Sequence, residues 1–254
     1  MARRSTATHR GAQEVKVKDF INPWPEQSKI HASFYNKNFS LEKIKTALPA
    51  EVELVALKQI HGNRVLNIED KKEYLKIKNE TLGVIEADAA VTKHSRIALT
   101  VHTADCLPLL AYDENVIGSC HAGWRGLSND IIENWIGDLI KQGARLEHLK
   151  IAIGPSIGPC HFEVGKDVSN VLSQIHGHEL PSDIKKRMVL KHSNSDKNFI
   201  HLSGLALYRL NQLGILAKNC ISFNECTHCN SEKYYSYRRD SAANGRLEGV
   251  IYRL

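Results

Sequence analysis

The 254-residue chain has no long hydrophobic run, no low-complexity tract and no internal repeat. Its most apolar segment, residues 97–112, is interrupted by His102 and Asp105, and it falls short of the roughly 18 apolar residues that a membrane-spanning helix needs. No linker rich in Pro, Gly or Ser divides the sequence. These absences argue against a membrane protein and a repeat protein, and they favour one domain over residues 19–254.

The first 18 residues lack the apolar core region of a secretory signal, although they carry three arginines and few acidic residues. A transit peptide would share part of this composition. We expect a basic, disordered extension over residues 1–18. The rest is expected to be a cytoplasmic domain whose six cysteines are reduced thiols.

Charge of one sign is not concentrated anywhere in the sequence. The net charge is +6, and the lysines are scattered among acidic residues. A nucleic-acid partner therefore has weak support, and a small anion such as phosphate is the partner that we expect. The sequence predicts no oligomeric state.

The densest chemistry lies in residues 103–126, TADCLPLLAYDENVIGSCHAGWRG. Apolar residues on either side of a short polar turn predict a β-hairpin with strands at 107–112 and 116–120. Pairing of these strands would bring Cys106 next to His121. A thiolate beside an imidazole serves as a nucleophile with its base, or as two ligands of zinc or copper. A buried thiol beside a hydrogen-bonded histidine is the structural alternative.

A third ligand candidate, His61, follows an alternating apolar stretch and stands beside Gly62, where a strand should give way to a turn. With Cys106 and His121 it forms a set of two histidines and one cysteine. Zinc held by only three protein ligands keeps a position open for water or substrate, as in catalytic sites. The spacings of 45 and 15 residues are too long for a zinc finger, so the fold has to assemble this set.

Seven short motifs occur between Lys58 and Leu254, in this order along the chain: LKQIHG, EADAAVT, TADCLPLLAYD, HAGWRGL, AIGPSIG, FEVGKDV and SYRRD. In these segments the chain resembles the YfiH-type family, long labelled multicopper polyphenol oxidases or laccase-domain proteins. The resemblance implies an α/β/β/α sandwich, related to folds with a Cys-His hydrolytic pair, and zinc bound by His61, Cys106 and His121. It also implies purine nucleoside phosphorylase activity on adenosine, inosine or guanosine, with adenosine deaminase and methylthioadenosine phosphorylase activities in addition.

The chain departs from the family's usual pattern near its beginning. Family members usually carry a glycine-rich loop of the kind R-x-GGVS and a segment resembling SLNLG, whereas HASFYNKNFSLEKIKTALP stands here at residues 31–49. Because that loop lines the substrate cleft in the family, the resemblance leaves the substrate of this chain open. The Asp-Leu pair that usually precedes the late helix is His201-Leu202 here.

Phosphorolysis requires a site for phosphate, and four arginines within the motifs are candidates. A planar guanidinium binds phosphate through two parallel hydrogen bonds, which favours arginine over the scattered lysines. Arg125 in HAGWRG is the first choice, and it is also assigned to the catalytic set with Cys106 and His121. Arg64, Arg238 and Arg239 are further phosphate ligands; a surface arginine is the structural alternative for each.

Deamination would add a carboxylate as a proton shuttle. The His-x-Glu signature of zinc deaminases is absent around the two motif histidines. Asp88, Asp105 and Glu163 are possible substitutes, and Asp88 is also assigned to substrate binding. For Asp88 and Asp105 the structural alternative is hydrogen bonding to backbone amides of turns. In a regular strand Asp105 would point away from Cys106.

Three other functions stay open beside the zinc phosphorylase. A copper polyphenol oxidase is less well supported, because no His-x-His pair occurs in the motif segments. A Cys-His hydrolase acting on a peptidoglycan precursor amide would use Cys106 as nucleophile and His121 as base. A zinc-stabilised binding domain is the non-enzyme alternative. The lone CTHC run, with Cys226 and Cys229, is a weak zinc or redox signal, and we interpret it as a loop.

Periodicity predicts strands at residues 29–34, 52–57, 89–92, 97–103, 107–112, 116–120, 149–153, 220–223 and 249–253. Helices are expected at 128–142, 166–175 and 202–213, with Ser128 as the N-cap of the first and Gly143 as its stop. Hairpin-length turns and isolated late helices favour an α+β class with mixed, largely antiparallel sheets.

Overall fold

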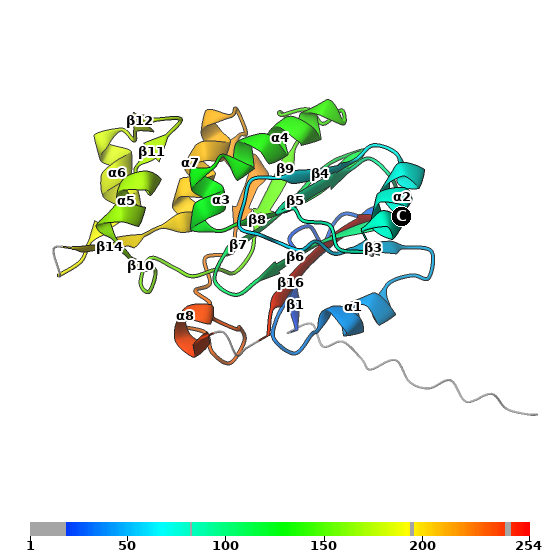
Figure 1. Ribbon diagram of the computed structural model, residues 1–254, viewed down its shortest axis with the longest axis horizontal. Coiled ribbons are helices and arrows are strands. Elements are labelled where there is room, and N and C mark those ends of the chain that lie inside the picture. The colour runs from blue at the N-terminus through cyan, green and yellow to red at the C-terminus, as the bar shows by residue number, and fades with distance from the viewer. Residues whose placement is uncertain (1–18, 82, 194–195, 242–244) are drawn as a thin grey trace, which may run out of the picture.

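The computed structural model describes residues 19–81, 83–193, 196–241 and 245–254. Two stacked β-sheets form its centre, and helices lie on the outer faces (Figure 1). The α+β class and the mixed sheets are confirmed. The extension expected over residues 1–18 lies outside the described residues.

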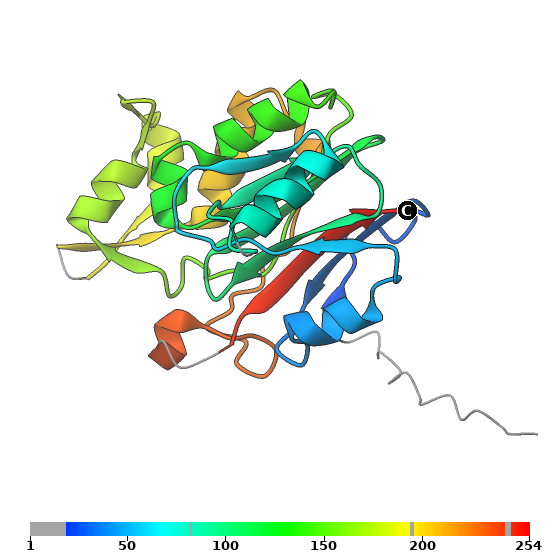
Figure 2. The same ribbon diagram turned by 45° about the vertical axis from the view of Figure 1, so that its right-hand side comes forward.

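One sheet has five strands in the spatial order β1 (Phe20–Ile21), β2 (Ile30–Tyr35), β16 (Leu247–Arg253), β6 (Ile97–Thr103) and β3 (Glu53–Val55). The C-terminal strand β16 lies between β2 and β6 and is antiparallel to both (Figure 2). Helix α1 (Leu41–Ala47) covers the outer face, where Ile44 packs with Ala98 and Val250. The segment that replaces the glycine-rich loop of the family therefore forms most of β2 and all of α1.

The second sheet has six strands in the order β15 (Cys220–Ser222), β9 (Lys150–Ile153), β7 (Leu107–Asp113), β8 (Val116–Ala122), β5 (Ala89–Thr92) and β4 (Val65–Ile68). Strands β7 and β8 form the expected hairpin, in which Pro108 pairs with His121. Most pairs are antiparallel; the parallel strands β15, β4 and β3 lie at sheet edges.

Both faces of the six-stranded sheet are buried, which explains the unbroken apolar sequence of β7. Leu107 and Leu109 face the layer of helices, whereas Leu110 and Tyr112 face the other sheet. This alternation is the period of two that a strand imposes on its side chains. The helical layer consists of α3 (Trp124–Ser128), α4 (Ile131–Lys141), α5 (Lys166–Leu172) and α7 (Leu202–Gln212).

The helix expected over residues 128–142 is two helices, and Ser128 ends the first instead of capping the second. The break lies at Asp130, which has a left-handed φ of 62°. Its carboxylate pairs with the buried guanidinium of Arg209 at 3.0 Å. A tertiary ion pair thus overrides the local helical pattern. The stop at Gly143 is confirmed, with a φ of 102°.

The helix expected over residues 166–175 is also shorter, because α5 ends at Leu172. The next residues form a small hairpin of β11 (Gln174–Ile175) and β12 (His178–Glu179), whose turn residues His176 and Gly177 both have positive φ. Periodicity did not predict helices α2 (Lys71–Glu80), α6 (Ser182–Met188) and α8 (Tyr237–Asp240) or the small sheet of β10 (Glu163–Gly165), β14 (Lys197–Ile200) and β13 (Val189–Lys191).

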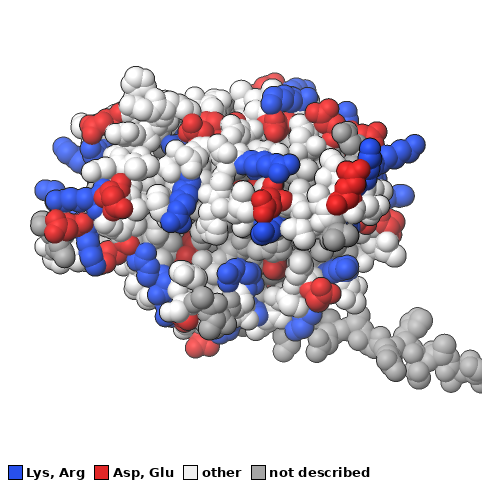
Figure 3. Space-filling model, viewed as in Figure 1, with Lys and Arg blue, Asp and Glu red and all other residues white. Residues whose placement is uncertain are grey.

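Charges of both signs are interspersed over the face of the molecule shown in Figure 3. Lys58, for example, lies 2.8 Å from Glu86, and Lys197 lies 2.6 Å from Glu163. Within the described part of the chain, no helix combines the length and the apolar character that crossing a bilayer requires.

Candidate functional site

His61, Cys106 and His121 come together where three parts of the fold meet. Cys106 lies where the chain passes from β6 to β7, that is, from one sheet to the other. His121 is near the end of β8, beside the start of β7. His61 belongs to the loop between β3 and β4. The ligand atoms of the three residues all lie within 4.8 Å of one another, and the two imidazole rings are nearly perpendicular, with centroids 4.8 Å apart.

Asp88 forms hydrogen bonds with both histidines, with the ring of His121 and with the backbone N–H of His61. Its buried carboxylate is 2.8 Å from Nδ1 of His121 and accepts backbone N–H groups from Ile60, His61 and Gly62 at 3.3, 2.8 and 2.7 Å. These bonds support the left-handed φ of 60° at His61. The hydrogen bonding to turn amides that the sequence suggested for Asp88 is present. Because its oxygens are occupied and only 2% of the residue is exposed, the contacts of Asp88 suit positioning of the histidines, and its assignment to substrate binding stays a prediction without support from these contacts.

The neighbouring groups change the acidity of the thiol and the imidazole. Burial raises the pKa of Cys106, but hydrogen bonds with His121 and His61 and the charge of these rings outweigh it and lower the pKa to about 6. Burial lowers the pKa of His121, but its bonds to Asp88 and Cys106 prevail and raise it to about 9. Near neutral pH these directions favour a thiolate at Cys106, the form that acts as a nucleophile and as a metal ligand.

A metal ion fits this set of residues. One thiolate and two imidazoles are a donor set that zinc accepts, and three protein ligands make an open site. Space is also kept clear beside the donors, because a Cβ atom at Gly123 would lie 3.1 Å from Sγ of Cys106 and 3.4 Å from Cδ2 of His61. The hydrogen bond that Nδ1 of His121 donates to Asp88 fixes the ring orientation in the way that carboxylates support histidine ligands.

Asp105 directs the chain between the two sheets, with a left-handed φ of 90°. Its carboxylate accepts hydrogen bonds from Thr227 Oγ1 at 2.6 Å, Ser236 Oγ at 3.1 Å and the backbone N–H of Arg238 at 2.7 Å. The carboxylate therefore joins the late loops to the residue next to Cys106. With all these bonds made inside the protein, Asp105 is an anchor and does not fit the role of proton shuttle.

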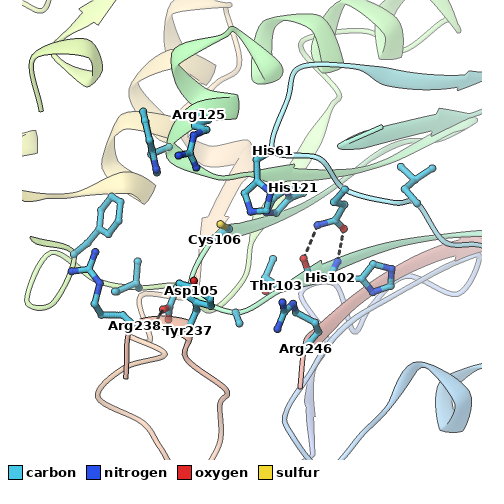
Figure 4. A pocket seen from close by; sticks show the side chains of 16 residues that line it. His61, His102, Thr103, Asp105, Cys106, His121, Arg125, Tyr237, Arg238 and Arg246 are labelled. Carbon is cyan, nitrogen blue, oxygen red and sulfur yellow. Dashed lines mark hydrogen bonds between the residues drawn. The ribbon is translucent and has the colours of Figure 1, made fainter. Parts of the chain in front are cut away.

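A pocket of about 680 Å³ opens over the three ligand candidates. Figure 4 shows Cys106 beside the rings of His61 and His121, with Arg125 and Arg238 at the same pocket. The guanidinium of Arg125 lies over the ring of Trp124, 4.5 Å from its centroid.

Besides Asp88, three of the expected site residues do not line the pocket. Arg239 donates to backbone carbonyls of Thr227, His228 and Tyr234 and pairs with Asp240, so its guanidinium is engaged in holding a loop. Arg64 is exposed outside the pocket. Glu163 pairs with Lys197 and His192, and Lys197 holds its pKa below the usual value. These contacts give no support to the phosphate role of Arg64 and Arg239 or to the shuttle role of Glu163, and these roles stay predictions.

The pocket also contains residues that the sequence analysis did not select: Leu57, Gln59, His102, Thr103, Ala104, Trp124, Ile157, Phe162, Tyr237 and Arg246. Aromatic side chains inside the HAGWRG, FEVG and SYRRD segments were the available signal. Gln59 and His102 exchange two hydrogen bonds across the pocket wall, at 2.7 and 2.8 Å. Among the described residues, none from 31–49 lines the pocket.

Comparisons with known proteins identify the family of the chain. The family model described as multi-copper polyphenol oxidoreductase laccase matches residues 36–254. Adenosine deaminase RL5 from an unknown prokaryotic organism is 30% identical over 203 residues, which cover 79% of this chain and 75% of that protein. A purine nucleoside phosphorylase of Haemophilus influenzae is 32% identical over 202 residues, covering 78% of this chain and 73% of that protein.

Solved structures share the fold. YfiH of Bacillus licheniformis superimposes with a TM-score of 0.81 at 20% identity, covering 94% of this chain and 98% of that chain. YlmD of Geobacillus stearothermophilus gives a TM-score of 0.77, with the same identity and coverage. From the match over residues 36–254 and the curated relatives, the chain belongs to the YfiH-type family of multi-copper polyphenol oxidoreductase laccase proteins.

Proposed function

We propose that the protein is a zinc-dependent purine nucleoside phosphorylase, with adenosine deamination as a second activity. The observation that carries the proposal is the set of His61, Cys106 and His121 at a pocket that also contains three arginines and the aromatic side chains of Trp124, Phe162 and Tyr237. Relatives at about 30% identity are named purine nucleoside phosphorylase and adenosine deaminase, which supports an enzyme acting on nucleosides.

Phosphate has a suitable binding place beside the three donors. Arg125 lines the pocket, and within the described residues its side chain forms no ion pair. Stacking on Trp124 orients the planar guanidinium for two parallel hydrogen bonds to phosphate. Arg238 is the second candidate, although its Nη1 already donates to the carbonyls of His161 and Glu163, at 3.3 and 2.9 Å.

The purine has apolar surfaces to bind against. Trp124, Phe162 and Tyr237 present aromatic rings to the pocket, and Ile157 adds an aliphatic side chain. Aromatic rings stack on bases whatever their exocyclic groups are. Recognition by stacking suits an enzyme that accepts both adenosine and inosine.

In the reaction, a phosphate oxygen forms a bond to C1′ of the ribose while the bond from C1′ to the purine nitrogen breaks. The electron pair of the broken bond goes to the base, which takes up a proton, and the products are the free base and ribose 1-phosphate. His61, Cys106 and His121 would hold the zinc ion, which supplies Lewis-acid chemistry when bound. Asp88 keeps His121 in one orientation, and the arginines hold phosphate in place.

A Cys-His hydrolase is the second candidate, and one observation favours it. The hydrogen bonds from Cys106 to His121 and from His121 to Asp88 match a nucleophile, a base and an orienting carboxylate. The second imidazole at the same sulfur, that of His61, argues for metal binding, since a nucleophile needs only one base. Copper oxidation and a binding domain without activity are further outcomes of the same test.

The test is to incubate metal-quantified protein with adenosine, with and without phosphate, and to separate adenine, inosine and ribose 1-phosphate by chromatography. Adenine released only with phosphate, and lost in Cys106→Ala but kept in the control Cys220→Ala, supports the phosphorylase. Inosine alone makes the protein a deaminase. Turnover that survives complete metal removal refutes the zinc proposal, and no turnover despite stoichiometric zinc favours the hydrolase or the binding domain.

A further inference from the structure

A second cluster of cysteine and histidine lies outside the pocket. The CTHC run brings Cys226 and Cys229 to the loop that carries Cys160 and His161. The four ligand atoms all lie within 4.8 Å of one another. Sγ of Cys160 is 3.6 Å from Sγ of Cys229, which is 3.3 Å from Nδ1 of His161. The interpretation of this run as an ordinary loop does not account for these short distances between residues 69 and 68 positions apart in sequence.

These separations are those of ligands around one tetrahedral ion. Zinc–sulfur bonds of about 2.3 Å at tetrahedral angles place two sulfurs about 3.8 Å apart, and a sulfur and a nitrogen about 3.5 Å apart. Three thiolates and one imidazole form one of the common structural zinc sites. The two sulfurs at 3.6 Å lie well beyond the roughly 2.05 Å of a disulfide bond.

Backbone N–H groups hold one of the ligands, Cys226, in place and favour its thiolate form. The N–H of Gly158 donates to Sγ of Cys226 at 3.2 Å, and the N–H of Cys229 also bonds to that sulfur. Such donors stabilise negative charge on sulfur. The two segments are also joined by backbone hydrogen bonds, since Ser156 and Cys226 form a bridge and Thr227 N–H donates to the carbonyl of Ser156 at 3.0 Å.

We propose that Cys160, His161, Cys226 and Cys229 bind a second zinc ion that joins the loop after β9 to the loop before α8. The site is closed, because four protein ligands complete a tetrahedron and leave no position for a substrate. Its role is to fix these loops to each other. Thr227, inside the CTHC run, holds Asp105, and Arg238 bonds to the carbonyl of His161, so the second ion stabilises one wall of the pocket.

Metal counting on the full chain tests the proposal without any substrate. Protein purified under reducing conditions with zinc and passed through metal-free buffer should hold two zinc ions per chain by plasma mass spectrometry. Cys229→Ser should lose one ion, and the control Cys220→Ser, which changes a half-buried thiol outside both clusters, should keep two. His61→Ala should also lose one ion, from the pocket.

Cobalt distinguishes which ion is left. In His61→Ala the remaining Co²⁺ should be bound by three thiolates and show strong sulfur-to-cobalt absorption, whereas in Cys229→Ser the Co²⁺ in the pocket has one thiolate and absorbs weakly. One zinc ion in the wild type that disappears in His61→Ala overturns the proposal. Two missing thiols in a count on denatured protein also overturn it, because they reveal a disulfide. The wild type and His61→Ala keep the second cluster intact, so these results stand even if Cys229→Ser does not fold.

Discussion

The two clusters of cysteine and histidine use similar donors in different surroundings. The pocket cluster has one cysteine and two histidines, placed at strand ends and supported by the carboxylate of Asp88. The loop cluster has three cysteines and one histidine, and backbone N–H groups support Cys226. Three ligands beside a pocket suit catalysis, whereas four ligands in a closed set suit the joining of two loops. The number of donors and the adjoining space, more than the donor types, separate the two roles.

Removal of a metal-ligand residue from the pocket cluster should have the largest effect on activity. Cys106→Ala is expected to reduce phosphate-dependent adenine release by about 10³-fold or more, because the ion and the thiolate are lost together. The measurement is product formation over time, together with metal content. Cys220→Ala is the control, since this thiol is in neither cluster. Activity within tenfold of the wild type would place the chemistry elsewhere in the pocket.

A change at Asp88, the carboxylate bonded to His121, should have the second-largest effect. Asp88→Asn keeps the shape of the side chain but weakens its bond to His121, so zinc affinity at the pocket should fall about 10- to 100-fold. Competition with a coloured chelator measures this affinity, and the loop cluster should keep its ion. Asp138→Asn on α4, outside the pocket cluster and paired with Lys141, is the control. An unchanged affinity would mean that Asp88 only shapes the turn at His61.

The sequence could predict the pocket cluster because its residues follow recognisable strands. The apolar runs of β7 and β8 fix the hairpin, and the hairpin places Cys106 near His121. The loop cluster depends on long-range contacts between Cys160 and the CTHC run, which no periodicity indicates. The same limit explains the wrong N-cap at Ser128, since the bond from Arg209 to Asp130 joins separate helices.

Asp105 links the two clusters and should affect stability more than chemistry. Asp105→Asn tolerates the left-handed φ but turns an amide N–H₂ toward groups that donate, so about 1–3 kcal/mol of unfolding free energy should be lost. For a chain of this size each kcal/mol lowers the melting temperature by about 2–4 °C. Thermal unfolding checks this, with the exposed Asp183→Asn as control. An unchanged melting temperature would show that the loops do not depend on this anchor.

Arg125 lines the pocket but belongs to neither cluster. Its removal should therefore weaken phosphate binding and leave both metal ions bound. Arg125→Ala is expected to raise the KM for phosphate about tenfold, or about 1.4 kcal/mol, with a smaller change for the nucleoside. Initial rates over a grid of phosphate and adenosine concentrations separate the two constants, and Arg187→Ala on an exposed helix is the control. An unchanged KM for phosphate would show that Arg125 does not bind phosphate. Of the four arginines first expected to bind phosphate, Arg238 would then be the one that still lines the pocket.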